Sequence, residues 1–112
     1  MADIVEIIQP SGKLDVEKLT LLNTEILDFL ARGVKLILLD FQDVTHIQFD
    51  CVDYLKEIVF KVQTHEGKFY CCSLNDQVKN VLETSQTNNF FYLLTSRQEF
   101  EEKILSAGSS SW

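Results

Sequence analysis

The sequence predicts an α/β domain with a parallel or mostly parallel sheet, on the basis of three observations. Short apolar and β-branched runs alternate with longer segments in which apolar residues recur every three or four positions. The run 34–41 is almost continuously apolar, as expected for a strand covered on both faces. The chain has 112 residues, the length of one small domain. We therefore expect one sheet joined by right-handed helical crossovers.

The first two expected elements are short strands. Residues 4–8 are apolar and β-branched, and Pro10 and Gly12 mark a turn after them. Residues 13–14 begin a second strand. Two short strands in succession suggest that one edge of the sheet is antiparallel.

A helix follows, with Asp15 as its N-cap and Gly33 at its end. Its apolar face is formed by residues at helical spacing, namely Val16, Leu19, Leu22, Ile26, Phe29 and Leu30. The run 34–41 is then the central strand. After a connection through 44–47, Asp50 is the expected N-cap of a second helix that ends near Gly67. The apolar face of this helix is Val52, Leu55, Val59 and Val62.

The last part of the chain repeats this alternation. We expect a strand at 68–74, a helix capped by Asn75, polar sequence at 85–89, and a short strand at 90–94. A capping box of Ser96 and Glu99 then begins a terminal helix. The apolar faces of the two helices are Val78, Val81 and Leu82, then Phe100, Ile104 and Leu105. The expected domain covers 1–106, with a disordered tail at 107–112.

Composition excludes several classes of function. The chain has 10 basic and 17 acidic residues and a net charge of -7, which disfavours nucleic acid as a partner. The apolar run Leu36–Leu39 is far shorter than the roughly 20 residues of a membrane-spanning helix, so no membrane insertion is expected. The N-terminus lacks a signal pattern, which predicts a cytoplasmic protein.

No catalytic, metal or cofactor motif is recognisable. The histidines His46 and His65 have no ligand or nucleophile spacing, and no glycine-rich phosphate loop follows a strand. Cys51, Cys71 and Cys72 show neither a disulfide framework nor metal spacing, so we expect three reduced, buried thiols. We therefore expect no enzyme activity, no metal and no cofactor.

Two segments resemble the STAS domain, the family of bacterial anti-sigma factor antagonists and of sulfate-transporter cytoplasmic domains. They are 12–15, Gly-Lys-Leu-Asp before the first helix, and 38–47, the end of the central strand with the segment after it. The resemblance covers roughly residues 3 to 105. It implies a STAS-like single domain of α/β class, with a mostly parallel four- to five-stranded sheet and about four helices.

The resemblance also marks a regulatory position. The family carries an Asp-Ser-Ser-Gly-Leu motif whose second serine is phosphorylated, and without gaps this motif falls on 48–52. Phe49 and Asp50 replace the two serines. Asp50 is thus the phosphosite equivalent and supplies one permanent negative charge, with Asp53 adding another in the same turn. One interpretation is a partial phosphate mimic, and the other is a simple N-cap.

The resemblance implies a binding module that acts by partner switching. Its expected partner is an anti-sigma factor or serine kinase of the histidine-kinase-like ATPase fold. The expected contact surface is the turn at Asp15 and the segment Thr45 to Val52, which includes Gln48, Phe49, Asp50 and Cys51. Phe49 either anchors the partner or packs against its own core as a staple before the helix. Thr45 is a candidate for phosphorylation or a packing residue.

Two other functions stay open within the same fold. The first is a stand-alone STAS subunit that regulates a membrane transporter complex. The second is a small-ligand sensor, which would show a ligand-dependent melting temperature. Both monomer and dimer remain open as the oligomeric state.

Overall fold

The protein is built on a four-stranded parallel sheet, seen in a computed structural model that describes residues 4–86 and 92–105. The strand order is β1-β3-β5-β6, and a separate parallel pair is formed by β2 and β4. The strands are β1 Val5–Ile8, β2 Ser11–Leu14, β3 Leu36–Asp40, β4 Asp43–Ile47, β5 Lys68–Cys72 and β6 Tyr92–Leu94. The helices are α1 Val16–Ala31, α2 Val52–Thr64, α3 Asp76–Thr84 and α4 Arg97–Phe100. A 3-10 turn, η1 Phe49–Cys51, precedes α2, and a π-helical turn, η3 Glu101–Leu105, follows α4.

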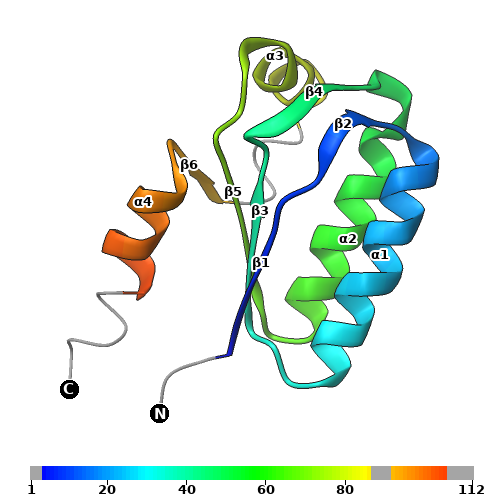
Figure 1. Cartoon of the computed structure of the whole chain (residues 1–112). Helices are drawn as coiled ribbons and strands as arrows, with labels where there is room; N and C mark the ends of the chain where they lie inside the picture. Colours follow the sequence, from blue (N-terminus) through cyan, green and yellow to red (C-terminus); the bar gives the residue numbers. More distant parts are fainter. Residues whose placement is uncertain (1–3, 87–91, 106–112) are drawn as a thin grey trace.

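Helices cover the two faces of the sheet unequally. In Figure 1, α1 and α2 lie side by side on one face, and α4 lies on the other. The larger apolar core lies under α1 and α2, and the smaller one lies beneath α4 and η3. Side chains of β5 alternate between these cores, with Cys71 in the first and Cys72 in the second. Both thiols, and that of Cys51, are free and buried, which confirms the prediction.

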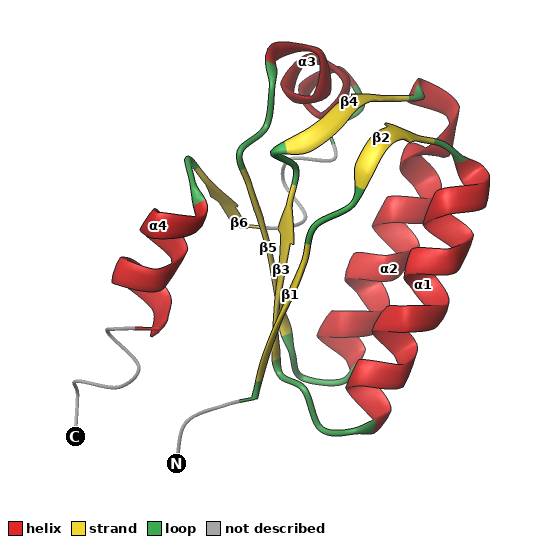
Figure 2. Ribbon diagram, in the orientation of Figure 1, coloured by secondary structure: helices red, strands yellow, loops and turns green. Residues whose placement is uncertain are grey.

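The pair β2 and β4 corrects two predictions. Residues 44–47 form most of a strand rather than a connection, and β2 is parallel to its partner rather than an antiparallel edge. Figure 2 shows β2 and β4 continuing beyond the ends of β1 and β3. Because β1 and β3 are parallel neighbours, their continuations also pair in parallel. No described strand is antiparallel to its neighbour.

Most predicted helix ends are confirmed by their hydrogen bonds. The Lys18 N–H donates to the Asp15 carboxylate at 2.9 Å, and the Val78 N–H donates to the Asn75 side-chain oxygen at 2.9 Å. Gly33 follows α1 with a φ of 91°, the left-handed conformation that glycine accepts at a helix end.

The C-terminal region closes the smaller core. The Glu99 N–H donates to the Ser96 hydroxyl at 3.1 Å and so caps α4, as predicted. Phe100 is fully buried and meets the ring of Tyr70 edge to face at 5.3 Å. Residues 90–91 of the predicted last strand, 87–89 of the polar stretch and the tail 107–112 lie outside the described residues. No helix within 4–86 or 92–105 has the length and apolarity to cross a membrane.

Candidate functional site

The predicted contact residues gather where β2 and β4 end and α1 and α2 begin. Leu14 and Ile47 are register partners at the ends of the two strands. The Gln48 N–H donates to the Leu14 carbonyl at 3.1 Å, which extends the pairing by one residue. The parallel pairing therefore brings Asp15, the next residue along the chain, close to the turn that starts at Phe49.

The turn η1 changes how α2 begins. The Cys51 N–H donates to the Gln48 carbonyl at 3.2 Å, so the 3-10 turn comes before the helix proper. Asp50 lies inside this turn, and no side chain caps either the turn or α2. The prediction that Asp50 is the N-cap is wrong, because the extra turn moves the start of α2 past it.

Phe49 and Asp50 are both exposed at this position. The side chain of Phe49 is 57% exposed, so it does not pack into the core as a staple. The Asp50 carboxylate forms no hydrogen bond or ion pair with the described residues. Asp53 is also exposed and adds an acidic group to the first turn of α2. An aromatic ring and two carboxylates thus face solvent together at the start of α2.

The buried thiol of Cys51 stabilises the turn η1 from its core side. This thiol is fully buried and donates to the carbonyls of Gln48 at 3.0 Å and Leu14 at 3.5 Å. Burial raises the pKa of the Cys51 thiol, and the nearby carboxylates of Asp50 and Asp15 raise it further.

The other predicted contact residues differ in their accessibility. Thr45 is exposed on β4, and its hydroxyl lies 3.3 Å from the ring nitrogen Nδ1 of His46. Gln48 and Asp15 are half-buried. Val52 is 3% exposed and belongs to the core, as does Cys51, so neither contributes a side chain to the surface.

Two further residues support the site, and the sequence analysis assigned neither this role. The Gln77 side chain accepts from the Ile47 N–H at 2.9 Å and donates to the Ile47 carbonyl at 3.1 Å. The Asn75 amide donates to the carbonyls of Val44 and Thr45 at 3.1 and 3.0 Å. These two side-chain amides form hydrogen bonds with the backbone of β4, as a neighbouring strand would. Only the capping role of Asn75 left a signal in the sequence.

The comparisons with known proteins decide the family. Residues 3–103 match the profile of the STAS domain. The chain belongs to the STAS domain family. Among curated protein sequences, none matches it significantly. The STAS assignment confirms the resemblance seen in the sequence.

Solved structures share the fold of this STAS domain. One is a putative anti-sigma factor antagonist, TM1081 of Thermotoga maritima, with 24% identity and a TM-score of 0.80 over 94% of this chain and 93% of that chain. Another is the anti-sigma factor antagonist SpoIIAA in its unphosphorylated form, with 14% identity and a TM-score of 0.73 over 88% of this chain and 87% of that chain. The structure of SLC26A9 contains a similar region, with 13% identity and a TM-score of 0.66 over 96% of this chain but 20% of that chain. The predicted STAS-like α/β fold is therefore confirmed.

Proposed function

We propose that this STAS domain is a protein-binding module of the anti-sigma factor antagonist type, working in a partner-switching system. The observation that carries the proposal is the exposed pair Phe49 and Asp50 at the entrance to α2. An exposed aromatic ring that lies outside the apolar core is a typical anchor of a protein interface. The proposed surface adds Asp15, Thr45 and Gln48 around this pair.

Charge sets the proposed regulation. At this position the family carries a serine, and its phosphorylation brings about two negative charges. Asp50 supplies one charge at all times, and no phosphorylation is needed for it. A charge at the centre of an interface alters affinity strongly when the partner has to desolvate it. The domain is thus held in one regulatory state, with Asp50 as a partial phosphate mimic.

The proposed partner is an anti-sigma factor or serine kinase of the histidine-kinase-like ATPase fold, in the cytoplasm. Two of the structures with this fold are described as anti-sigma factor antagonists, which supports the choice. The buried Cys51 and Val52 hold the surface in shape without touching the partner.

The test is affinity capture from a lysate of the source organism, with the captured proteins identified by mass spectrometry. The wild type is compared with Phe49→Ser and Asp50→Ser. Phe60→Ser is the matched control, because Phe60 is 69% exposed on α2 but lies well beyond its first turn. We expect an ATPase-fold protein that Phe49→Ser loses and Phe60→Ser retains.

The Asp50→Ser variant separates the two interpretations of Asp50. We expect it to bind the same protein more tightly or to become phosphorylated by it. Equal capture by all four proteins would overturn the proposal. Capture of a transporter subunit in place of an ATPase-fold protein would also overturn it and support the transporter-subunit alternative.

A further inference from the structure

The strand β1 has an open edge. It is the first strand in the sheet order, and no strand in the described part of the chain pairs with its outer side. The Leu36 N–H donates to the Ile4 carbonyl at 3.2 Å, so the backbone of Ile4 faces β3. Because backbone groups alternate in direction along a strand, the N–H and C=O of Val5 and Ile7 point to the open edge. This edge offers hydrogen bonds to an added strand.

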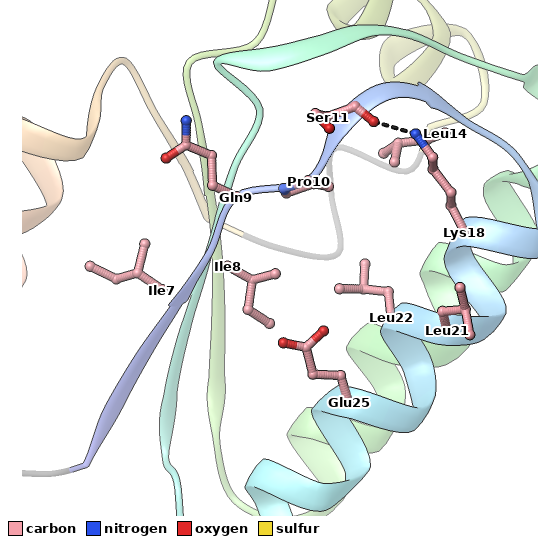
Figure 3. Close-up of a pocket in the computed structure, with 10 residues that line it drawn as sticks. All are labelled: Ile7, Ile8, Gln9, Pro10, Ser11, Leu14, Lys18, Leu21, Leu22 and Glu25. Atoms are coloured by element: carbon pink, nitrogen blue, oxygen red, sulfur yellow. Dashed lines mark hydrogen bonds between the residues drawn. The ribbon is translucent and has the colours of Figure 1, made fainter.

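A pocket of about 430 Å³ lies beside this edge, between β1, the segment that follows it, and α1. Figure 3 shows Ile8 on the strand side of the pocket and Leu22 on the helix side, with Pro10 above them. Leu21 forms part of the rim and is 67% exposed. Apolar side chains of an incoming segment would therefore find an apolar surface next to the open backbone groups.

The pocket lining holds two charged residues of opposite sign, Lys18 and Glu25, which have different surroundings. The Lys18 ammonium donates to the Ser11 carbonyl and is directed away from the lower part of the pocket. Glu25 extends from α1 toward β1 in Figure 3, and its carboxylate has no hydrogen-bond or ion-pair partner among the described residues. The whole chain carries a net charge of -7. A basic group near Glu25 would be attracted both by this carboxylate and by the negative net charge of the chain.

We propose that β1 and this pocket form a docking site for an extended, basic and apolar peptide segment of a partner protein. The segment adds to β1 as a further strand of the sheet. One apolar side chain enters the pocket between Ile8 and Leu22, and a Lys or Arg lies against Glu25. Backbone pairing supplies affinity and the pocket supplies selectivity, as in other cases of strand addition. This site adjoins the surface around Phe49 at Leu14 but uses different side chains, and it does not rest on the proposed partner switching.

A peptide fits this site better than the other occupants. The pocket is open to solvent rather than closed around a small molecule, which leaves room for an extended chain. A second copy would bring a second charge of -7, and the Glu6 side chains of two paired β1 strands would add to the repulsion. A partner with positive charge meets neither obstacle.

The probe is a capped heptapeptide, Thr-Val-Thr-Val-Thr-Lys-Thr, which places valine and lysine on one face of a strand. Binding is followed by the amide chemical shifts of the isotope-labelled full-length protein. We expect shifts confined to β1 and the neighbouring part of α1. Two analogues carry N-methyl groups on alternate residues, one on the threonines and one on the valines and lysine. Strand addition uses the N–H groups of one set only, so one analogue should lose binding and the other keep it.

Protein variants test the pocket with the fold intact, because the substituted residues are exposed. Leu21→Ser should weaken binding about tenfold. Leu27→Ser is its control, since Leu27 is 36% exposed on the same helix but outside the pocket. Glu25→Lys should weaken the lysine peptide and favour its glutamate analogue.

Three outcomes would overturn the proposal. They are the absence of binding at millimolar peptide, equal binding by both methylated analogues, and shifts located away from β1. Sedimentation of the protein alone tests the competing occupant. A concentration-dependent dimer that the peptide does not dissociate, with its interface at β1, would assign the edge to a second copy instead.

Discussion

The Asp40 carboxylate and the Arg97 guanidinium form an ion pair at 3.2 Å, which joins the end of β3 to the first turn of α4. Asp40 is 1% exposed, and it also accepts from the Gln42 N–H at 3.0 Å. Arg97 donates in addition to the Gln9 side chain at 2.8 Å, and Gln9 donates to Asp43 at 2.8 Å. This network ties α4 to the carboxyl ends of the strands, and it compensates the burial of a charged side chain.

Removing Arg97 should therefore destabilise the protein. In Arg97→Ala the buried carboxylate keeps its bond from Gln42 and loses its countercharge, so we expect the free energy of unfolding to fall by about 2 kcal/mol. Arg32→Ala is the matched control, because its ion pair with Asp28 at 3.1 Å is exposed. That change should cost less than about 0.5 kcal/mol. Urea denaturation measures the free energy of unfolding of both variants. A loss in Arg97→Ala as small as that in Arg32→Ala would show that α4 is held by its apolar contacts alone.

Asp15 and Asp50 should differ in their effect on stability. The Asp15 carboxylate accepts a hydrogen bond at the start of α1, so Asp15→Ala should lower the free energy of unfolding by about 1 kcal/mol. Asp50 caps nothing, so Asp50→Ala should change it by less than about 0.5 kcal/mol. Thermal denaturation compares the two variants. A larger loss for Asp50→Ala would mean that the residue is retained for stability rather than for binding.

Gln77 should control the order of β4. In Gln77→Ala the N–H of Ile47 loses its partner, which costs about 1 to 2 kcal/mol and opens that end of the strand to solvent. Amide hydrogen exchange should show a faster rate at Ile47. Gln42→Ala serves as control, because the exposed Gln42 side chain forms no bond with the described residues. Unchanged protection of Ile47 in Gln77→Ala would show that pairing with β2 alone holds the strand.

Periodicity and capping predicted most of the elements. The helical spacing from Val16 onward and the cap at Asp15 located α1, because both are local properties of the sequence. β4 was missed for a physical reason. Its buried residues Val44 and Ile47 are three apart, since the pairing of β2 with β4 shifts register between Gly12 and Lys13. A strand with this irregularity lacks the alternation of apolar and polar residues by which strands are predicted from sequence.

The candidate site was located by resemblance rather than by chemistry. The family motif placed Asp50 and Phe49 at the start of α2, and local rules suggested a cap and a staple there. The 3-10 turn removed both roles, and no sequence pattern indicated that turn. The bonds from Gln77 and from Arg97 join residues far apart in the chain, so only the folded structure shows them.

Alkaline pH should weaken the fold through the buried thiols. Burial raises the pKa of Cys72 from 9.0 to about 11, and it raises that of Cys71 well above 9.0. Between these values the unfolded thiols lose protons that the folded thiols keep, so the unfolded state binds fewer protons and stability falls as pH rises. The stability contributed by the buried neutral Cys72 is complete below pH 9 and is lost toward pH 11. We expect a loss of about 1 to 3 kcal/mol from this thiol over that interval.

The comparison with Cys72→Ala isolates this effect. Lysine and tyrosine side chains also titrate in this range, but they do so in both proteins, so the difference in slope belongs to the thiol. Urea denaturation at intervals from about pH 8 to about pH 11 should give a shallower decline for the variant. Cys72→Ala also loses the packing contacts of a buried sulfur. This packing loss lowers the free energy of unfolding by the same amount at every pH, so it does not affect the slope. Parallel curves for the two proteins would show that the thiol ionises as readily in the folded state as in the unfolded chain.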